Sequence, residues 1–172
     1  VIMSLLEIEL PDGTKKEVAP GTTPYDVAAS IGEGLARQSI AARFNGRLID
    51  VTRPLEDSGS LSLITQNSPE ALEIIRHSCA HLMAQAVKEL YGDEVQVTIG
   101  PAIKDGFYYD FYSTTKKFVP EDFPVIEKKM AELAKADLPV TREVMSRDDA
   151  IAMFRGMGES YKVCLLYTSD AA

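Results

Sequence analysis

The sequence predicts an α+β protein made of two small domains that join near residue 67. Leu6–Leu10 alternates apolar and polar residues, which is the period of a half-buried strand. Asn45-Gly46 is the strongest two-residue signal for a β-hairpin. Between Pro69 and Tyr91, apolar residues recur at helical spacing until Gly92 ends the pattern. Short strands and a long helix in one chain indicate the α+β class.

In the first domain, Thr23 and Pro24 predict the start of a helix, because threonine caps helices and proline suits the first helical position. Gly32 and Gly34 predict its end. Strands are expected over residues 6–10, 15–18, 40–44, 47–51 and 60–65. The resulting order β-β-α-β-β-β predicts a ubiquitin-like β-grasp fold.

The second domain is predicted to begin with a long helix, with Ser68 as its N-cap and Pro69 at the first helical position. Ser146 predicts the cap of a later helix. Strands are expected over residues 95–99, 106–111 and 138–144, and further helices over residues 120–136 and 146–154.

Composition and charge exclude several classes of protein. Of the 172 residues, 45% are hydrophobic and 26% charged, as in soluble globular proteins. A net charge of −8 argues against a sequence-independent nucleic-acid binder, which needs a basic surface. No run approaches the roughly 18 apolar residues of a membrane span, and no basic leader precedes Glu7. We expect a cytoplasmic protein without membrane contact, in which Cys79 and Cys164 are reduced.

The only two histidines, His77 and His81, lie four residues apart on the predicted long helix and therefore share one face. Two neutral imidazoles can hold a metal or polarise a water molecule, although two histidines satisfied by hydrogen bonds in a core are an alternative. Ser78 stands where a zinc protease helix needs glutamate. Catalytic zinc needs three protein ligands, so no complete metal site is expected.

A glycine-rich bend and an aromatic strand form a second candidate cluster. Gly100 follows a predicted strand, where glycine allows a ligand to approach the backbone. Alternation along the next strand places Tyr109 and Phe111 on one face and Tyr108 and Asp110 on the other. An ordinary aromatic strand with one buried face explains this pattern equally well. Further along, a lysine at position 162 follows a glycine turn, which is weak evidence of a site.

These clusters, taken in order, resemble the N-terminal part of threonyl-tRNA synthetases. The similarity to the TGS domain of this family lies in Leu10–Gly13, Asp26–Ala28, Ile31–Ala36 and Asn45-Gly46. The similarity to its editing domain lies in Glu73–Leu82, Ile99–Pro101, Gly106–Asp110 and Gly158–Val163. The resemblance implies a TGS domain over residues 1–65 and the N-terminal part of a tRNA editing domain over residues 66–163.

The resemblance also implies a function. The family attaches threonine to its tRNA with ATP, and its editing domain hydrolyses serine that was attached in error. By position, His77 and His81 resemble the residues that hold or activate the hydrolytic water. Tyr109 and Lys162 match positions that contact the terminal adenosine or the seryl ester. Gly100 and Asp110 match positions that shape the pocket.

The sequence departs from the family pattern in two ways. The family completes its editing site with a Cys-x-x-x-His pair, which is absent here, and residues 164–172 do not match the family's continuation. We expect residues 164–172 to be a non-native tail and the segment after Gly156 to be disordered. The aminoacylation core, with its ATP, magnesium and zinc sites, and the anticodon-binding domain are also absent. The family is usually homodimeric through that core.

Three alternatives stay open at this point. A freestanding deacylase would edit tRNA in trans but would need the missing Cys/His pair. A binding or regulatory module would account for the TGS-like region but leaves the histidine pair unexplained. An editing domain of the alanyl type would use zinc, and the TGS-like region argues against it.

Overall fold

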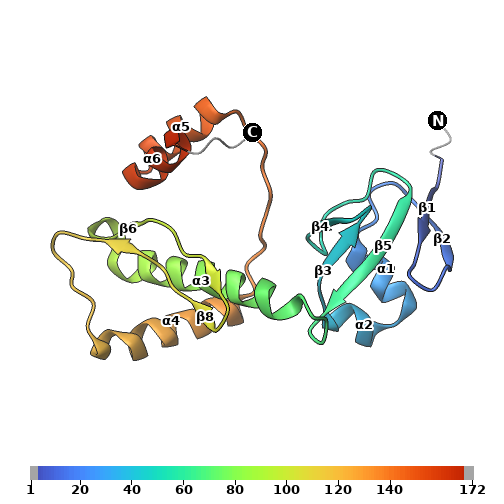
Figure 1. Cartoon of the computed structure of the whole chain (residues 1–172), viewed down its shortest axis with the longest axis horizontal. Coiled ribbons are helices and arrows are strands. Elements are labelled where there is room, and N and C mark those ends of the chain that lie inside the picture. Colours follow the sequence, from blue (N-terminus) through green and yellow to red (C-terminus); the bar gives the residue numbers. More distant parts are fainter. Residues whose placement is uncertain (1–3, 169–172) are drawn as a thin grey trace. The chain divides into compact units, whose positions relative to one another are not determined.

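The computed structural model describes residues 4–168, without the side chain of Thr168. The chain divides into two compact units, an N-terminal unit, Val1–Ile74, and a C-terminal unit, Ile75–Ala172. Figure 1 shows both units, and each is described by itself below. Of the predicted tail, residues 169–172 lie outside the described residues.

The N-terminal unit contains a five-stranded mixed sheet in the order β2-β1-β5-β3-β4. β1 and β5 pair in parallel at its centre, whereas every other pair is antiparallel. The strands are β1 (Leu6–Glu9), β2 (Lys15–Val18), β3 (Ser39–Phe44), β4 (Arg47–Ile49) and β5 (Gly59–Thr65). The sheet and its helix confirm the predicted β-grasp fold.

Helix α1 (Pro24–Ile31) starts as the sequence predicts. The Thr23 hydroxyl accepts a hydrogen bond from the Asp26 N–H at 3.2 Å, and the Asp26 carboxylate accepts one from the Thr23 N–H at 2.9 Å. A second helix, α2 (Glu33–Gln38), was not predicted, because Gly34 indicated a helix end and instead lies inside α2. Only Gly32, in extended backbone, separates the two helices.

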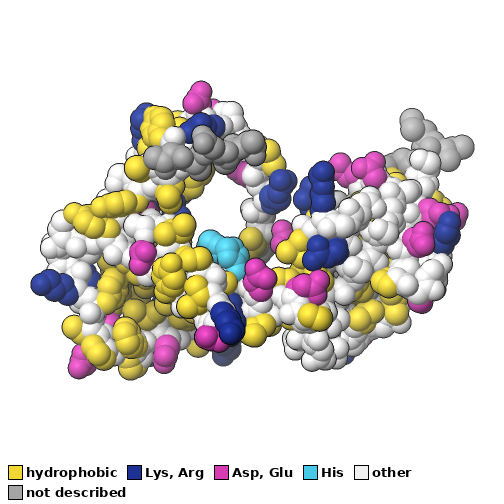
Figure 2. Space-filling model, viewed as in Figure 1, with side chains coloured by type: hydrophobic (Ala, Val, Ile, Leu, Met, Phe, Trp, Pro, Cys, Tyr) yellow, Lys and Arg dark blue, Asp and Glu magenta, His cyan; other side chains and the backbone are white. Residues whose placement is uncertain are grey.

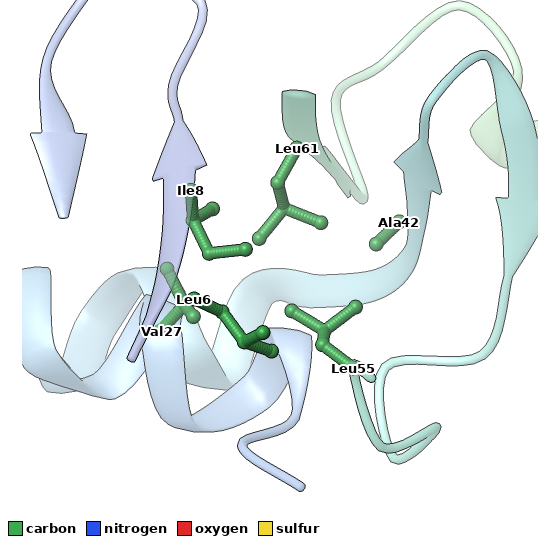
Figure 3. Close-up of a cluster of buried hydrophobic side chains, with 6 residues drawn as sticks. All are labelled: Leu6, Ile8, Val27, Ala42, Leu55 and Leu61. Atoms are coloured by element: carbon green, nitrogen blue, oxygen red, sulfur yellow. The ribbon is translucent and has the colours of Figure 1, made fainter. Parts of the chain in front are cut away.

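The core of this unit lies between the sheet and α1. Figure 3 shows the α1 side chain Val27 pointing toward Ile8 and Leu61 of the sheet. Strand β1 alternates buried and exposed residues, which confirms the predicted period. The buried cluster consists of Leu6, Ile8, Val27, Ala42, Leu55 and Leu61.

The Asn45-Gly46 turn joins β3 and β4 as predicted, with Phe44 paired to Arg47. Both turn residues have positive φ, 48° for Asn45 and 79° for Gly46, which matches the twist of a two-residue hairpin. The Asn45 side chain also accepts a hydrogen bond from the Ser60 N–H at 2.9 Å. The turn is therefore tied to β5 as well.

Helix α3 (Ala71–Tyr91) runs across the division between the units and provides the first element of the C-terminal unit. Residues Ala86 and Val87 of α3 pack with Val95 and with Ile126 and Leu133 of α4. Figure 1 shows α4 beside α3. After α3 come η1 (Gly92–Glu94), β6 (Gln96–Val97), β7 (Ala102–Ile103), β8 (Gly106–Phe107), β9 (Phe111–Tyr112), η2 (Pro120–Asp122), α4 (Phe123–Ala136), α5 (Arg147–Gly156) and α6 (Ser160–Thr168).

Two predicted boundaries in this region were wrong. Helix α3 begins at Ala71 rather than Pro69, because the Ser68 hydroxyl accepts a hydrogen bond from the Thr65 N–H at 2.9 Å. The predicted strand over residues 106–111 is two short strands that pair with different partners. β8 pairs with β7, whereas β9 pairs with β6. The chain changes partner between them, so no single strand forms.

The predicted strand over residues 138–144 is absent from the structure. Val140 is 90% exposed and Val144 is 77% exposed, and no described residue pairs with this segment as a strand. Its β-branched residues fit the strand pattern, but a strand needs a partner for its backbone groups.

The prediction of disorder after Gly156 was also wrong, because residues 160–168 form α6. The Arg147 side chain donates hydrogen bonds to the Leu166 and Tyr167 carbonyls at 2.7 and 2.8 Å. These are carbonyls of the last helical turn, which have no partner within the helix. Within residues 4–168, no helix is long and apolar enough to cross a membrane.

Candidate functional site

The histidine pair lies on α3, which brings the two rings together one turn apart. The His77 and His81 Nε2 atoms are 3.1 Å apart, and the rings meet edge to face with centroids 4.6 Å apart. Both side chains are exposed, and Figure 2 shows them as the cyan atoms at the surface. Since one Nε2 must donate and the other accept, the pair shares a single proton in this contact. These are surface histidines rather than core ones.

The surroundings of His81 favour its neutral form. Partial burial of the ring lowers its pKa, and the nearby His77 and Lys162 lower it further because they disfavour a second positive charge. A neutral imidazole offers a nitrogen lone pair at neutral pH. His81 can therefore accept a proton from water.

Tyr109 lies next to His81, with ring centroids 6.4 Å apart. Its ring stacks on Phe111 at 5.1 Å, which confirms that these two residues face the same way. Burial raises the pKa of the Tyr109 hydroxyl, and the negative charge of Glu159 raises it further. The hydroxyl therefore stays protonated at neutral pH and can donate a hydrogen bond.

Gly100 affects the candidate site through its close contact with the Tyr109 ring. A Cβ atom at position 100 would overlap the Tyr109 ring. The space that glycine leaves open is therefore filled by a tyrosine of the same site, whereas the sequence suggested that a ligand would use it. Gly100 allows the Tyr109 ring to lie flat against the backbone.

Asp110 is held in this region through its backbone. Its backbone N–H donates to the Ile99 carbonyl at 2.9 Å, and its carbonyl accepts from the Thr98 N–H at 3.1 Å. The carboxylate is exposed and forms no hydrogen bond or ion pair with another residue between positions 4 and 168. The structure thus shows a contact role for the Asp110 backbone next to Tyr109, and an exposed carboxylate.

Lys162 lies in α6, with its ammonium nitrogen 5.9 Å from the centre of the Phe154 ring. The pKa of His81 is lowered by partial burial, by the charge of His77 and, least of the three, by the positive charge of Lys162. The residue that holds the start of α6 is Glu159, a buried carboxylate that pairs with Lys88 at 2.8 Å. Glu159 belongs to the Gly158–Val163 stretch, but the sequence gave it no role. A carboxylate directly after a glycine turn was its only signal.

An apolar groove of about 580 Å³ lies between α3, α4 and the aromatic strands, with Tyr109 among its lining residues. The sequence did not predict it. Its lining residues are Cys79, Met83, Val87, Phe107, Tyr109, Phe111, Phe118, Phe123, Ile126, Glu127 and Met130. Within the described part of the chain, no three His, Cys, Asp or Glu side chains gather closely enough to hold a metal ion.

The chain combines a β-grasp unit with a helix that carries a histidine pair. Residues 6–65 match the TGS domain family, so the N-terminal unit contains a TGS domain. Nearly the whole chain also matches proteins named threonine–tRNA ligase. That of Syntrophotalea carbinolica is 60% identical over 169 residues, which are 98% of this chain and 26% of that protein.

The ligases of Pelobacter propionicus and Teredinibacter turnerae are each 54% identical over 164 residues, or 95% of this chain. Over nearly its whole length the chain is similar to the first quarter of these threonine–tRNA ligases. It spans about a quarter of the length of the curated relatives that it matches.

Proposed function

We propose that this chain is part of a threonine–tRNA ligase and that its C-terminal unit contributes to the hydrolysis of serine from mischarged threonine tRNA. The observation that carries the proposal is the exposed His77–His81 pair, with Nε2 atoms 3.1 Å apart and with the ring of Tyr109 next to His81. The relatives' name supports the parent activity, and the cluster supports the hydrolytic step.

The cluster contains the groups that ester hydrolysis needs. A water molecule must lose a proton as it attacks the ester carbonyl, and neutral His81 can accept that proton. Negative charge then develops on the carbonyl oxygen, where a hydroxyl or an ammonium group stabilises it. Tyr109 and Lys162 supply one group of each kind.

Editing is chemically necessary for an enzyme that selects threonine. Serine lacks only one methyl group of threonine, and one methyl group contributes about 1–3 kcal/mol of discrimination in binding. A separate hydrolytic site removes the serine that the synthetic site accepts in error.

The parent enzyme would use ATP and magnesium, with a zinc ion in its catalytic core, and would work as a cytoplasmic homodimer. The net charge of −8 is consistent with a larger protein in which other parts make most contacts with the tRNA backbone. No step of the proposed hydrolysis runs through a metal.

The proposal is tested with this chain and a stable amide analogue of the seryl-adenosine end of tRNA, next to its threonyl counterpart. We expect the seryl analogue to shift the NMR signals of His77 and His81 at concentrations where the threonyl analogue does not. Hydrolysis of seryl-tRNA, measured in parallel, should exceed the uncatalysed rate.

The variants H77A and H81A should remove both effects, whereas S78A, a change at an exposed neighbour on α3, should not. Signals that respond equally to both analogues, or to neither, would contradict the proposal.

A second function, a binding module, is favoured by the TGS match and by the separate core of that unit. In that case tRNA would bind to residues 6–65 without turnover. A freestanding deacylase is the third possibility, and turnover by this chain at rates like those of a complete ligase would support it.

A further inference from the structure

We propose that Glu159 is a positioning residue, which docks the start of α6 on α3 and β6 so that Lys162 is held toward the histidine pair. The role of Glu159 in hydrolysis rests on the proposed function. The contacts of Glu159 do not depend on that function.

Glu159 is a buried charge with partners on two other elements. It is 7% exposed, and its Oε1 atom lies 2.8 Å from the Nζ atom of Lys88 on α3. Its Oε2 atom accepts a hydrogen bond from the Val97 N–H of β6 at 3.4 Å. Lys88 also donates to the Val95 carbonyl at 3.2 Å. A buried carboxylate needs such partners, so the position of Glu159 is closely specified.

The residues after Glu159 attach the same end of α6 to the small sheet. The Ser160 hydroxyl donates to the Gln96 side chain at 2.6 Å, and the Tyr161 ring packs on Tyr112 with centroids 5.1 Å apart. The Glu159 carbonyl accepts from the Val163 N–H at 3.1 Å, which closes the first turn of α6. Lys162 lies within that turn. Docking of residues 159–161 therefore fixes the backbone position from which the Lys162 side chain extends.

The spacing along α3 connects this docking point to the histidines. His81 and Lys88 are seven residues apart, which is about two helical turns, or roughly 10 Å along one face. Because Glu159 docks at Lys88, the start of α6 is held about two turns of α3 from His81. Partial burial and His77 lower the pKa of His81, and the positive charge of Lys162 lowers it further.

The competing explanation is that the ion pair between Glu159 and Lys88 only stabilises the fold. An NMR titration of His81 distinguishes this explanation from the positioning role. The charged or titratable groups that act on this ring are His77 and Lys162, with Tyr109 beside it. If E159Q releases Lys162, the pKa of His81 should rise toward its ordinary value of 6.5. Loss of the Glu159 negative charge, without release of Lys162, would instead lower the pKa of His81.

The experiment compares the titration of His81 in the unaltered chain, E159Q, K162A and the double variant E159Q/K162A. E143Q is the matched control, because Glu143 is an exposed carboxylate of the same unit without an ion pair to another described residue. We expect E159Q and K162A each to raise the pKa of His81, and the double variant to show a pKa no higher than that of K162A, because only the loss of the Glu159 charge is added there. E143Q should leave it unchanged.

Binding of the seryl analogue should weaken in E159Q on the order of tenfold, the effect of losing one charged hydrogen bond. An unchanged or lowered pKa of His81 in folded E159Q would overturn the inference. So would additive effects in the double variant.

If E159Q does not fold, E159D carries the test, because it keeps the charge and shortens the side chain by one methylene. The pKa of His81 should then rise through geometry alone, and an unaltered value in folded E159D would overturn the inference. The titration needs no tRNA. If the unaltered chain neither binds the seryl analogue nor hydrolyses seryl-tRNA, the proposed function fails while the titration still decides the role of Glu159.

Discussion

At the scale of single residues, the proposed hydrolysis depends on the protonation of His81. Its ring is partly buried and lies near His77 and Lys162, which lower its pKa. The spacing of the two histidines in the sequence predicted their shared face. Lys162 entered the predicted site only through the family resemblance, because no local pattern connects a residue of α6 with one of α3.

We predict that His81 makes stability depend on pH below neutrality. Because its pKa in the folded protein is lower than 6.5, the unfolded chain binds more protons between the two values. The free energy of unfolding therefore falls as the pH drops from 6.5 through the folded pKa. Chemical denaturation of the chain and of H81Q between pH 7 and pH 5 measures this, and H81Q should show the smaller decrease. An equal decrease in both would contradict the prediction.

We predict that G100A displaces Tyr109, because the added methyl group would overlap its ring. Overpacking of this kind costs about 1–3 kcal/mol. The Tyr109 and Phe111 ring signals should shift in NMR spectra, and the seryl analogue should bind more weakly. G156A is the matched control, because a methyl group there meets no other atom within 4 Å. Unchanged Tyr109 signals in G100A would count against this role of Gly100.

At the scale of elements, local signals were reliable where one side chain caps a helix or a turn. Thr23 begins α1 and Asn45-Gly46 closes the β3–β4 hairpin, both as predicted. Local signals failed for residues 138–144, whose β-branched pattern fits a strand but finds no partner among the described residues. They also missed α2, because Gly34 is tolerated inside a helix.

We predict that T23A destabilises the N-terminal unit by about 1 kcal/mol, since the hydroxyl satisfies an N–H of the first turn of α1. T52A, at an exposed threonine of the same unit, should change stability by less than about 0.5 kcal/mol. Denaturant unfolding followed on signals of this unit measures both. Equal stabilities of T23A and T52A would show that the cap contributes nothing.

At the scale of the whole molecule, the two units have separate cores. One core joins residues of β1, α1, β3 and β5, whereas the other joins residues of α3 and α4. Neither buried cluster contains a residue of the other unit.

We predict that I8A unfolds the N-terminal unit more readily while leaving the core of the C-terminal unit protected. Ile8 is fully buried, and removing such a side chain costs about 2–5 kcal/mol. Amide hydrogen exchange should accelerate in β1 and β5 but not at Val87 in α3. I31A is the control, because Ile31 is 48% exposed. Equally accelerated exchange at Val87 would show that the two cores unfold together.

The sequence by itself determined the β-grasp order of the first unit, the start of α1 and the shared face of His77 and His81. Each of these depends on residues that are near neighbours in the chain, so their chemistry is visible in the sequence. The tertiary structure alone decided that Tyr109 fills the space at Gly100 and that Glu159 docks on Lys88. These contacts join residues from separate elements, and only packing and the burial of charge bring them together.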